Sequence, residues 1–511
     1  MSKNFRWIVL AALSVIAFLI NMDYSAVNLA LIPMAADLHA SLNTIQWTLG
    51  AYVLAWAVFV IPAGVFVDKY GKRNMCLLGI GIFVLASLFA GIASSAGALI
   101  ASRVLQGIGG AIFIPTLYAL IYVNFEEYER GKAMGMISLG VGLGLAAGPF
   151  IGGILLEWLG WPGIFFINIP IGLAALSVIY LNRMTEQLQT DIKINKSSVA
   201  LLSVAIISVL YLLGNWHAWS QQVTFSLGLV LVAFMSFFSF IFAQRKLATP
   251  LIPLNIFTHA PFLGCIIGML LEQFSFSAIL VTTGLYLQKV LQLPVLTSSM
   301  VYLAFTVIFG IIAAMGGSWV DRVGLKKPII IGLLLTGLAA LLFIWLSSSN
   351  DLRAICSIFI VFGIGLGLAF AGLNTAILKT APQGHIGIAT GVFLMFALLG
   401  NAFSVTITTM VYEKQSLVKL VESVTPSAEI SVPQRSQLAT YVSNVGAKEY
   451  DLSAFTQPIQ TTILNETPSA LNYGVNSAMF VNFVALMLAT LACGMLMRSQ
   501  REEKSVAEMA S

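Results

Sequence analysis

The sequence predicts an all-α integral membrane protein of fourteen spans that arose by internal duplication. The chain has 511 residues, of which 59% are hydrophobic and 9% charged, and its mean hydropathy is +0.93. A soluble domain carries roughly 25% charged residues. Apolar runs long enough to cross a bilayer recur along the chain. A short charged motif occurs twice, as GVFVDKYGKR at 64–73 and as GSWVDRVGLKK at 317–327.

The two copies of this motif predict two corresponding halves. Gly64 corresponds to Gly317 and Asp68 to Asp321, in each case 253 positions later. Each copy follows a long apolar run, so it occupies the same place in its half. Duplications of this kind are common in secondary transporters.

Each predicted span is an apolar run of about 20 residues, the length that a helix needs to cross the hydrocarbon core. The first run contains Asp23 and exceeds the roughly 7–15 residues of a signal-peptide core, so we interpret it as a retained helix. The runs lie at 8–29, 45–67, 75–94, 98–123, 132–155, 164–181, 199–215, 223–243, 260–287, 297–319, 327–347, 352–378, 388–412 and 474–496.

The distribution of positive charge favours cytoplasmic positions for both ends of the chain. Segments assigned to the inside contain 19 of the 26 Lys and Arg residues, whereas the short outside loops contain only Lys289 and Arg353. Long loops are largely exempt from this rule. Residues 413–473 form one such polar loop on the outside, which we expect to be a solvated connector, a partly ordered loop or a lid.

The predicted domain order follows from the spans and the duplication. Two six-helix bundles flank two additional helices, and a short tail ends the chain. The expected boundaries are 1–183 for the first bundle, 184–259 for the additional helices and their linkers, 260–497 for the second bundle with its external loop, and 498–511 for the cytoplasmic tail.

Four further motifs occur in a characteristic order. They read NMDYSAVNLALIP at 21–33, LIASRVLQGIGGA at 99–111, GLAAGPFIGG at 144–153 and WPGIFFINIPIG at 161–172. Together with the loop at 64–73, they resemble the signature motifs of the major facilitator superfamily, and in particular its fourteen-span drug:proton antiporter branch. Two departures are Pro162-Gly163, where the branch usually has Arg-Trp, and Ser25, where it usually has Thr.

This resemblance implies a fold and a function. The expected fold is that of the superfamily, two six-helix bundles around a central cavity, with two extra spans. The expected function is proton-coupled efflux of amphipathic or cationic solutes by alternating access in the cell (inner) membrane, without a cofactor. Members of the branch usually act as monomers. Use of a periplasmic adaptor protein is left open.

Three charged residues within predicted spans are candidate coupling residues, because such residues face cavities or partners. At 1.5 Å per residue, Asp23 and Arg103 both lie roughly 8–9 Å below the outer boundary, so they could pair. The resemblance implies that these two positions take part in proton coupling. Glu272 lies roughly 18 Å deep, near the midplane. A structural ion pair and a protonated Glu272 bonded between helices are the alternatives.

A glycine stripe marks the fifth span. Gly140, Gly144, Gly148 and Gly152 recur at every fourth residue, which allows another helix to approach closely. Pro149 removes a backbone donor and favours a kink. The residues alone predict a packing face, whereas the resemblance identifies an antiporter motif that is typical of exporters.

The two charged loops are candidates for a cytoplasmic gate. An aspartate there can accept hydrogen bonds from a helix N-terminus, whose partial positive charge favours it, and the basic residues could bridge to the other bundle. Positive charge that only fixes topology is the alternative. The candidate gate residues are Gly64, Asp68, Lys69, Gly71, Arg73, Gly317, Asp321 and Arg322.

Aromatic and amide side chains on the spans are candidates for the cavity wall. Tyr52 and Trp56 lie one helical turn apart, as do Tyr118 and Tyr122, and aromatic faces attract lipophilic cations. Such pairs also occur as packing or interface residues. The candidate cavity residues are Asn28, Tyr52, Trp56, Gln106, Tyr118, Tyr122, Gln273 and Asn401.

Other function classes have less support in the sequence. It contains no nucleophile–base set, no metal-binding cluster and no GxxxxGK[ST] motif, so we expect neither an enzyme nor an ATP-driven pump. Nucleic acid is not an expected partner, since the charge lies in membrane-flanking loops. A proton-coupled uptake symporter and a dedicated exporter of a metabolite such as a siderophore or lipid remain alternatives.

Overall fold

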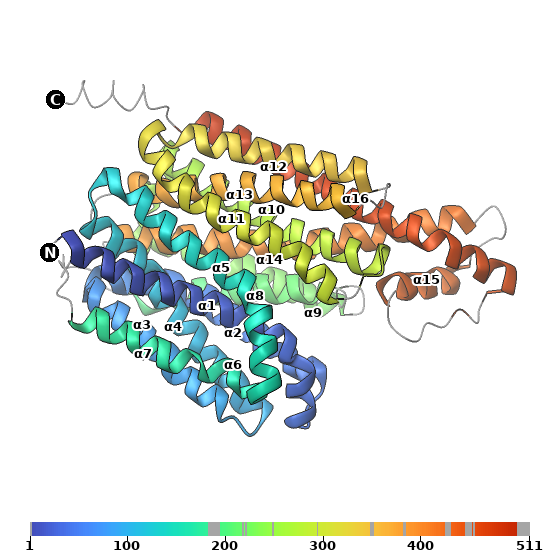
Figure 1. The fold of residues 1–511 in the computed structure, drawn as a ribbon, viewed down its shortest axis with the longest axis horizontal. Coiled ribbons are helices and arrows are strands. Elements are labelled where there is room, and N and C mark those ends of the chain that lie inside the picture. The colour runs from blue at the N-terminus through green and yellow to red at the C-terminus, as the bar shows by residue number, and fades with distance from the viewer. Residues whose placement is uncertain are drawn as a thin grey trace.

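The computed structural model describes residues 3–181, 195–216, 219, 222–247, 250–293, 295–347, 352–381, 385–424, 431–444, 452 and 455–497. Over these residues the secondary structure is helical and contains no strand. The long helices run side by side along the long axis of the molecule (Figure 1). The linker at 184–194 and the tail at 498–511 lie outside the described residues.

The helices fall into two halves with an extra pair between them. The first half contains α1 (Lys3–Asp37), α2 (Leu42–Tyr70), α3 (Lys72–Gly91), α4 (Ala96–Asn124), α5 (Glu127–Leu159), α6 (Pro162–Phe166) and α7 (Asn168–Leu181). The extra pair is α8 (Lys196–Gly214) and α9 (Val223–Lys246). The second half contains α10 (Ala260–Leu285), α11 (Val295–Val323), α12 (Lys326–Leu346), α13 (Leu352–Thr380), α14 (Ile386–Val424), α15 (Val432–Asn444) and α16 (Gln457–Leu496).

The number of membrane-crossing helices agrees with the prediction. Among the described residues, thirteen spans are long and apolar enough to cross a membrane, and α6 and α7 together form one of them. The two parts of α5, Glu127–Leu145 and Phe150–Leu159, are bent by 50° and add a fourteenth if they form one span. The bend lies within residues 146–149, a stretch that contains Pro149, whose missing backbone donor favours a kink.

Glycines set the closest contacts between helices. A Cβ atom added at Gly144 would collide with the Phe18 carbonyl oxygen, and one at Gly148 would collide with the Ser25 side chain. The glycine stripe of α5 therefore packs directly on α1, because only hydrogen atoms stand between the two backbones. Between the halves, α5 packs on α11 and α2 packs on α14.

The extra pair packs on one side of the junction between the halves. Helix α8 contacts both α2 and α14, and the Thr406 hydroxyl donates to the Leu213 carbonyl at 2.9 Å. Helix α9 packs on α8 and exposes most of its apolar side chains, among them Phe234 and Phe238. Such a surface is suited to contact with lipid tails.

The outer segment 413–473 differs from the predicted polar loop. Helix α14 continues to Val424, α15 follows, and α16 begins at Gln457, while residues 425–430, 445–451 and 453–454 lie outside the described residues. These helices form a cap that projects beyond the bundle, at the right of Figure 1. The reason is a shared apolar core that includes Leu420, Leu438, Tyr441 and Ile463. The average composition of residues 413–473 is polar, so this core is not evident from composition alone.

Substitution of Leu438 by Ala should loosen this cap. Leu438 is fully buried, and truncation of a buried leucine costs about 2–5 kcal/mol. We expect faster amide hydrogen exchange in residues 432–444 of the detergent-purified protein, with Ser436→Ala on the exposed face of α15 as the control. Equal exchange in the two variants would contradict the shared core.

Candidate functional site

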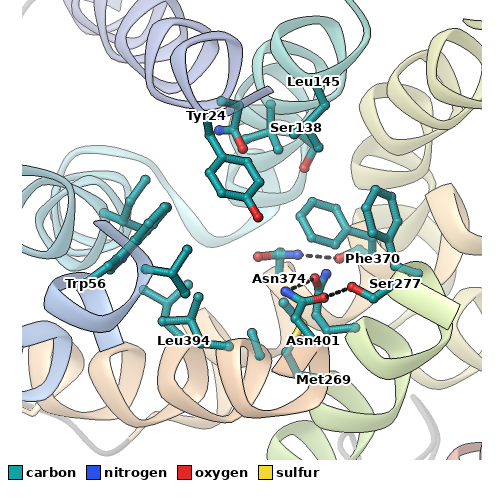
Figure 2. A pocket seen from close by; sticks show the side chains of 18 of the residues that line it. Tyr24, Trp56, Ser138, Leu145, Met269, Ser277, Phe370, Asn374, Leu394 and Asn401 are labelled. Atoms are coloured by element: carbon teal, nitrogen blue, oxygen red, sulfur yellow. Dashed lines mark hydrogen bonds between the residues drawn. The ribbon is translucent and has the colours of Figure 1, made fainter. Parts of the chain in front are cut away.

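A cavity of about 440 Å³ lies between the two halves, and residues of both halves line it. Its wall is largely apolar and aromatic, and none of the described residues that line it is charged. Figure 2 shows Tyr24 and Asn374 projecting into this space from opposite sides. The polar lining residues are Asn21, Tyr24, Tyr52, Trp56, Tyr118, Ser138, Gln273, Ser277, Asn374 and Asn401. The cavity therefore fits an apolar molecule with a few hydrogen-bonding groups.

Asp23 and Arg103 form a buried ion pair behind the wall of the first half. The Arg103 Nη1 atom donates to Asp23 Oδ2, and both side chains are fully buried. Arg103 also donates to the Thr48 carbonyl at 3.0 Å and to Gln106 Oε1 at 2.7 Å. The sequence thus placed the pair at matching depth, and the structure brings the two residues into contact.

The ion pair reaches the cavity through Tyr52. The Arg103 guanidinium carbon lies 4.3 Å from the centroid of the Tyr52 ring, and Tyr52 lines the cavity. A cation over an aromatic face is an attractive contact. A change in the charge of Asp23 would therefore alter the forces on a residue of the cavity wall.

Asn168 completes this network and was not predicted from the sequence. Its Nδ2 atom donates to Asp23 Oδ1 at 2.9 Å, and the side chain is fully buried. Asn168 lies in the motif at 161–172. It is a polar residue within an apolar run, and this was the signal by which the sequence could have identified it. Gln106, predicted for the cavity, belongs instead to this network, because it bonds Ser87 at 2.7 Å.

On the cavity wall of the first half, three buried polar atoms have no hydrogen-bond partner within the described residues. They are the Tyr52 hydroxyl, Trp56 Nε1 and Ser138 Oγ, and each belongs to a residue of the cavity wall. Buried polar atoms are rarely left unpaired, because the loss of water costs free energy. These atoms are therefore suited to bind a hydrogen-bond acceptor on a guest molecule.

The wall of the second half carries a hydrogen-bonded group of amides. Asn401 Nδ2 donates to Gln273 Oε1 at 3.2 Å, and Gln273 Nε2 donates to Glu272 Oε2 at 2.9 Å. Gln273 and Asn401 line the cavity, as predicted from the sequence, whereas Glu272 lies fully buried behind them. Ser277, which was not predicted, joins this group.

Both aspartates of the repeated motif cap helices of the opposite half. Asp68 accepts from the backbone N–H groups of Gly387 and Ile388 at 3.0 and 3.1 Å, in the first turn of α14. Asp321 accepts from those of Gly131 and Lys132 at 3.2 and 3.1 Å in α5. A carboxylate near a helix N-terminus is stabilised by the helix dipole. The end of the bundle that contains both motifs, called the motif end below, is therefore closed.

Glycines and one side-chain pair complete this closure. A Cβ atom at Gly64 would collide with the Gly387 carbonyl, and one at Gly317 would collide with the Gly131 carbonyl. Nearer the cavity, the Tyr118 hydroxyl of α4 donates to Asn374 Oδ1 of α13. The halves thus meet backbone to backbone below the cavity.

Other predicted residues lie away from these contacts. Tyr122 packs under the Arg130 guanidinium, at 4.1 Å, and Asn28 lines a separate outer cavity with Gln288 and Tyr302. Arg73 donates to the Tyr180 carbonyl of its own half at 2.5 Å. Gly71 adopts a φ of 94° between α2 and α3, a value that glycine allows. Lys69 lies 5.3 Å from the centroid of the Tyr70 ring in its own half, and Arg322 is exposed.

Comparison with known proteins adds a family and relatives. The model of the Major Facilitator Superfamily matches residues 13–405. The tetracenomycin C resistance and export protein of Streptomyces glaucescens is 32% identical over 388 residues, 75% of this chain and 72% of the relative. The multidrug transporter protein MdtP of Bacillus subtilis is 27% identical over 445 residues, 86% of this chain and 81% of the relative. The solved structure of the proton:xylose symporter XylE has a TM-score of 0.64 over 98% of this chain and 97% of its own, at 11% identity, and shows likeness of fold alone.

Substitution of Gly64 by Leu should open the motif end. The added side chain cannot occupy the space of the Gly387 backbone, so states in which the halves separate there become more populated. We expect a longer distance between spin labels attached to cysteines introduced at Tyr70 and Lys327. The distance is measured by double electron–electron resonance in a protein whose native cysteines have been replaced.

The matched control for this measurement is Gly81→Leu, because no atom lies within 4 Å of a Cβ placed at Gly81. An unchanged label distance in Gly64→Leu, with the protein still folded, would show that the glycine contact does not hold the motif end closed.

Proposed function

This chain belongs to the major facilitator superfamily, and we propose that it is a proton-coupled antiporter that exports amphipathic small molecules. Membership makes it a multi-pass membrane transporter rather than an enzyme. The export direction is supported by relatives whose names state export and multidrug transport. The glycine stripe of α5, which resembles the antiporter motif of exporters, supports the same direction and the fourteen-span branch.

The proposed orientation places the motif end in the cytoplasm. The connections at that end are rich in basic residues, and cytoplasmic loops carry an excess of Lys and Arg. The basic residues concerned are Lys69, Lys72, Arg73, Arg130, Lys132, Arg322, Lys326 and Lys327. In this orientation the closed gate lies inside and the described conformation faces outward, in the inner membrane.

The observation that carries the proposal is the buried Asp23–Arg103 pair behind Tyr52. A proton from outside that binds Asp23 would neutralise the carboxylate and weaken its bond to Arg103. The guanidinium would then shift against the Tyr52 ring, and the bound solute would be released outward. Loss of the proton on the inner side would restore the pair for the next solute. The proton gradient is then the energy source, and no cofactor takes part.

The chemistry of the cavity supports a neutral or singly charged solute. Among the described residues no charged side chain lines it, so a dication would lose its hydration without gaining a counter-charge. The unpaired donors Tyr52, Trp56 and Ser138 favour a solute that presents an acceptor, such as a carbonyl oxygen, to the first half. Aromatic walls favour a flat apolar body.

Substitution of Asp23 by Asn should abolish coupling. Asparagine cannot take up a proton, so solute addition to energised inverted membrane vesicles should no longer release protons. The measurement uses a fluorescent reporter of the proton gradient and a panel of dyes, biocides and antibiotics. Asp37→Asn is the matched control, since Asp37 lies on the same helix and bonds Trp161 at 2.9 Å, away from the cavity. Full proton-driven transport by Asp23→Asn would remove Asp23 from the coupling path.

Replacement of Trp56 by Phe should weaken solute binding while the aromatic wall is kept. A single hydrogen bond contributes about 0.5–1.5 kcal/mol, which corresponds to a loss of affinity of about two- to tenfold. Binding to the purified protein can be measured by isothermal titration calorimetry, whose signal does not depend on tryptophan fluorescence. Trp7→Phe, near Phe125 at the motif end, is the control. If Trp56→Phe and wild type bound every solute with equal affinity, a hydrogen bond from Trp56 Nε1 to the solute would be excluded.

A further inference from the structure

We propose that Glu272 is a second proton-binding group, and that a chain of three hydrogen bonds through Gln273, Asn401 and Ser277 links its protonation to solute in the cavity. This inference rests on the proposed function, because it describes how the second half would take part in the same exchange. It adds a site in α10 and α14 to the one at Asp23, so that each half would carry one proton.

The burial of Glu272 calls for a neutralising partner. Its side chain is fully buried, and within the described residues its Oε1 atom has no hydrogen-bond partner. A buried carboxylate without a counter-charge is strongly unfavourable. The ion pairs found in the described part of the chain join other residues: Arg103 with Asp23, Arg6 with Glu129 and Lys419 with Glu422. A proton is therefore the natural neutralising group.

The helices around Glu272 supply no cation at its level. From α4, the Tyr118 hydroxyl lies within electrostatic range of Glu272. The other ionisable side chains of α10 and its neighbours α13, α14 and α16, and of the short turns at 254–258 and 286–290, are cysteines and tyrosines or lie toward the ends of these helices. They are Cys265, Tyr286, Lys289, Arg353, Cys356, Lys379, Tyr412, Glu413, Lys414, Lys419, Glu422, Glu466, Tyr473 and Cys493. On α14 the first of them, Tyr412, lies about three helical turns beyond Asn401.

The hydrogen bonds from the cavity to Glu272 all point the same way. The Ser277 hydroxyl donates to Asn401 Oδ1 at 2.6 Å, a bond shown in Figure 2. Asn401 then donates to Gln273 at 3.2 Å, and Gln273 donates to Glu272 Oε2 at 2.9 Å. This order is compatible with an ionised Glu272, whose two oxygens only accept, and also with a neutral acid that accepts through its carbonyl oxygen. Bonds aligned in this way polarise and strengthen one another.

In the proposed mechanism, proton binding lets this chain reverse. Once an O–H bond forms on Glu272, the acid can donate to the Gln273 oxygen, and rotation of the two amides lets Gln273 donate to Asn401 and Asn401 to Ser277. The Ser277 hydroxyl is then free to donate into the cavity. In the ionised state the Ser277 hydroxyl donates to Asn401, so its oxygen can accept a hydrogen bond from a solute in the cavity. No bond other than the carboxyl O–H is made or broken, and one proton is exchanged.

The direction of the chain defines the solute that would expel the proton. A hydroxyl or N–H group that donates to Ser277 stabilises the ionised chain and so favours proton release from Glu272. The unpaired donors of the first half favour an acceptor at the other side of the same solute. The solute class is thus an apolar ring system with a carbonyl-type acceptor on one edge and a hydroxyl or amine donor on the other.

The first test needs no solute. Difference infrared spectra of the purified full-length protein between acidic and alkaline pH report protonated carboxyl groups. We expect a carboxylic C=O band that Glu272→Gln lacks and that Asp23→Asn and Glu272→Asp retain. A spectrum of Glu272→Gln that equals the wild-type spectrum, with the protein still monodisperse, would overturn the assignment of Glu272 as a proton site.

The second test measures coupling, with tetracenomycin C as the probe. Proton release on its addition to weakly buffered protein is read with a pH dye. We expect Glu272→Gln to release one proton fewer per bound probe than wild type. Asn401→Leu, which interrupts the chain, should lose the same proton while it keeps the infrared band, and Asn215→Leu, which replaces an exposed amide at the end of α8, should behave as wild type.

The outcomes separate this inference from the proposed function. If wild type releases protons and Glu272→Gln or Asn401→Leu releases the same number, the link through Asn401 is overturned and antiport stands. If wild type binds the probe and neither it nor any variant releases protons, the coupling role of Glu272 and the proposed antiport are both overturned.

Discussion

The cost of placing charge in an apolar interior governs this molecule. Asp23 and Arg103 are tolerated because they neutralise each other and because Gln106, Asn168 and the Thr48 carbonyl bond to them, although Arg103 Nη2 has no partner within the described residues. The same cost makes the pair responsive, since the gain or loss of one proton changes the charge balance of a region that water does not reach. In the proposed cycle, helix positions in the first half are thereby tied to the protonation state of a single carboxyl group.

Closure at the motif end depends on two equivalent contacts, which explains why the charged motif is repeated. Asp68 and Asp321 each reach backbone N–H groups in the opposite half, and a glycine pair beside each aspartate lets the backbones touch. These bonds use the main chain of the partner half, so they do not depend on the identity of its side chains. If the halves separate, water can replace the aspartates at the exposed helix turns, so the backbone N–H groups there need not stay unpaired.

The sequence predicted the elements better than the faces that they present. Hydropathy located the spans because the bilayer fixes their length, and depth along the helices suggested that Asp23 and Arg103 could meet. Rotation about the helix axis was not available from one sequence. Tyr122 was therefore assigned to the cavity although it packs under Arg130, and Asn168 and Asn374, which bond across helices, were missed. The cap of α14, α15 and α16 was hidden because its apolar residues are diluted by a polar composition.

Helix α8 gives the two sides of the molecule different relations to the bilayer. It packs against α2 and α14, so it covers one of the two seams along which the halves meet, and α9 widens this cover toward the lipid. The other seam, between α5 and α11, is bordered by the bend at 146–149 and by the exposed Phe150. The pair α8–α9 thus covers one of the two seams with protein, which makes the two sides of the molecule unequal in the plane of the membrane.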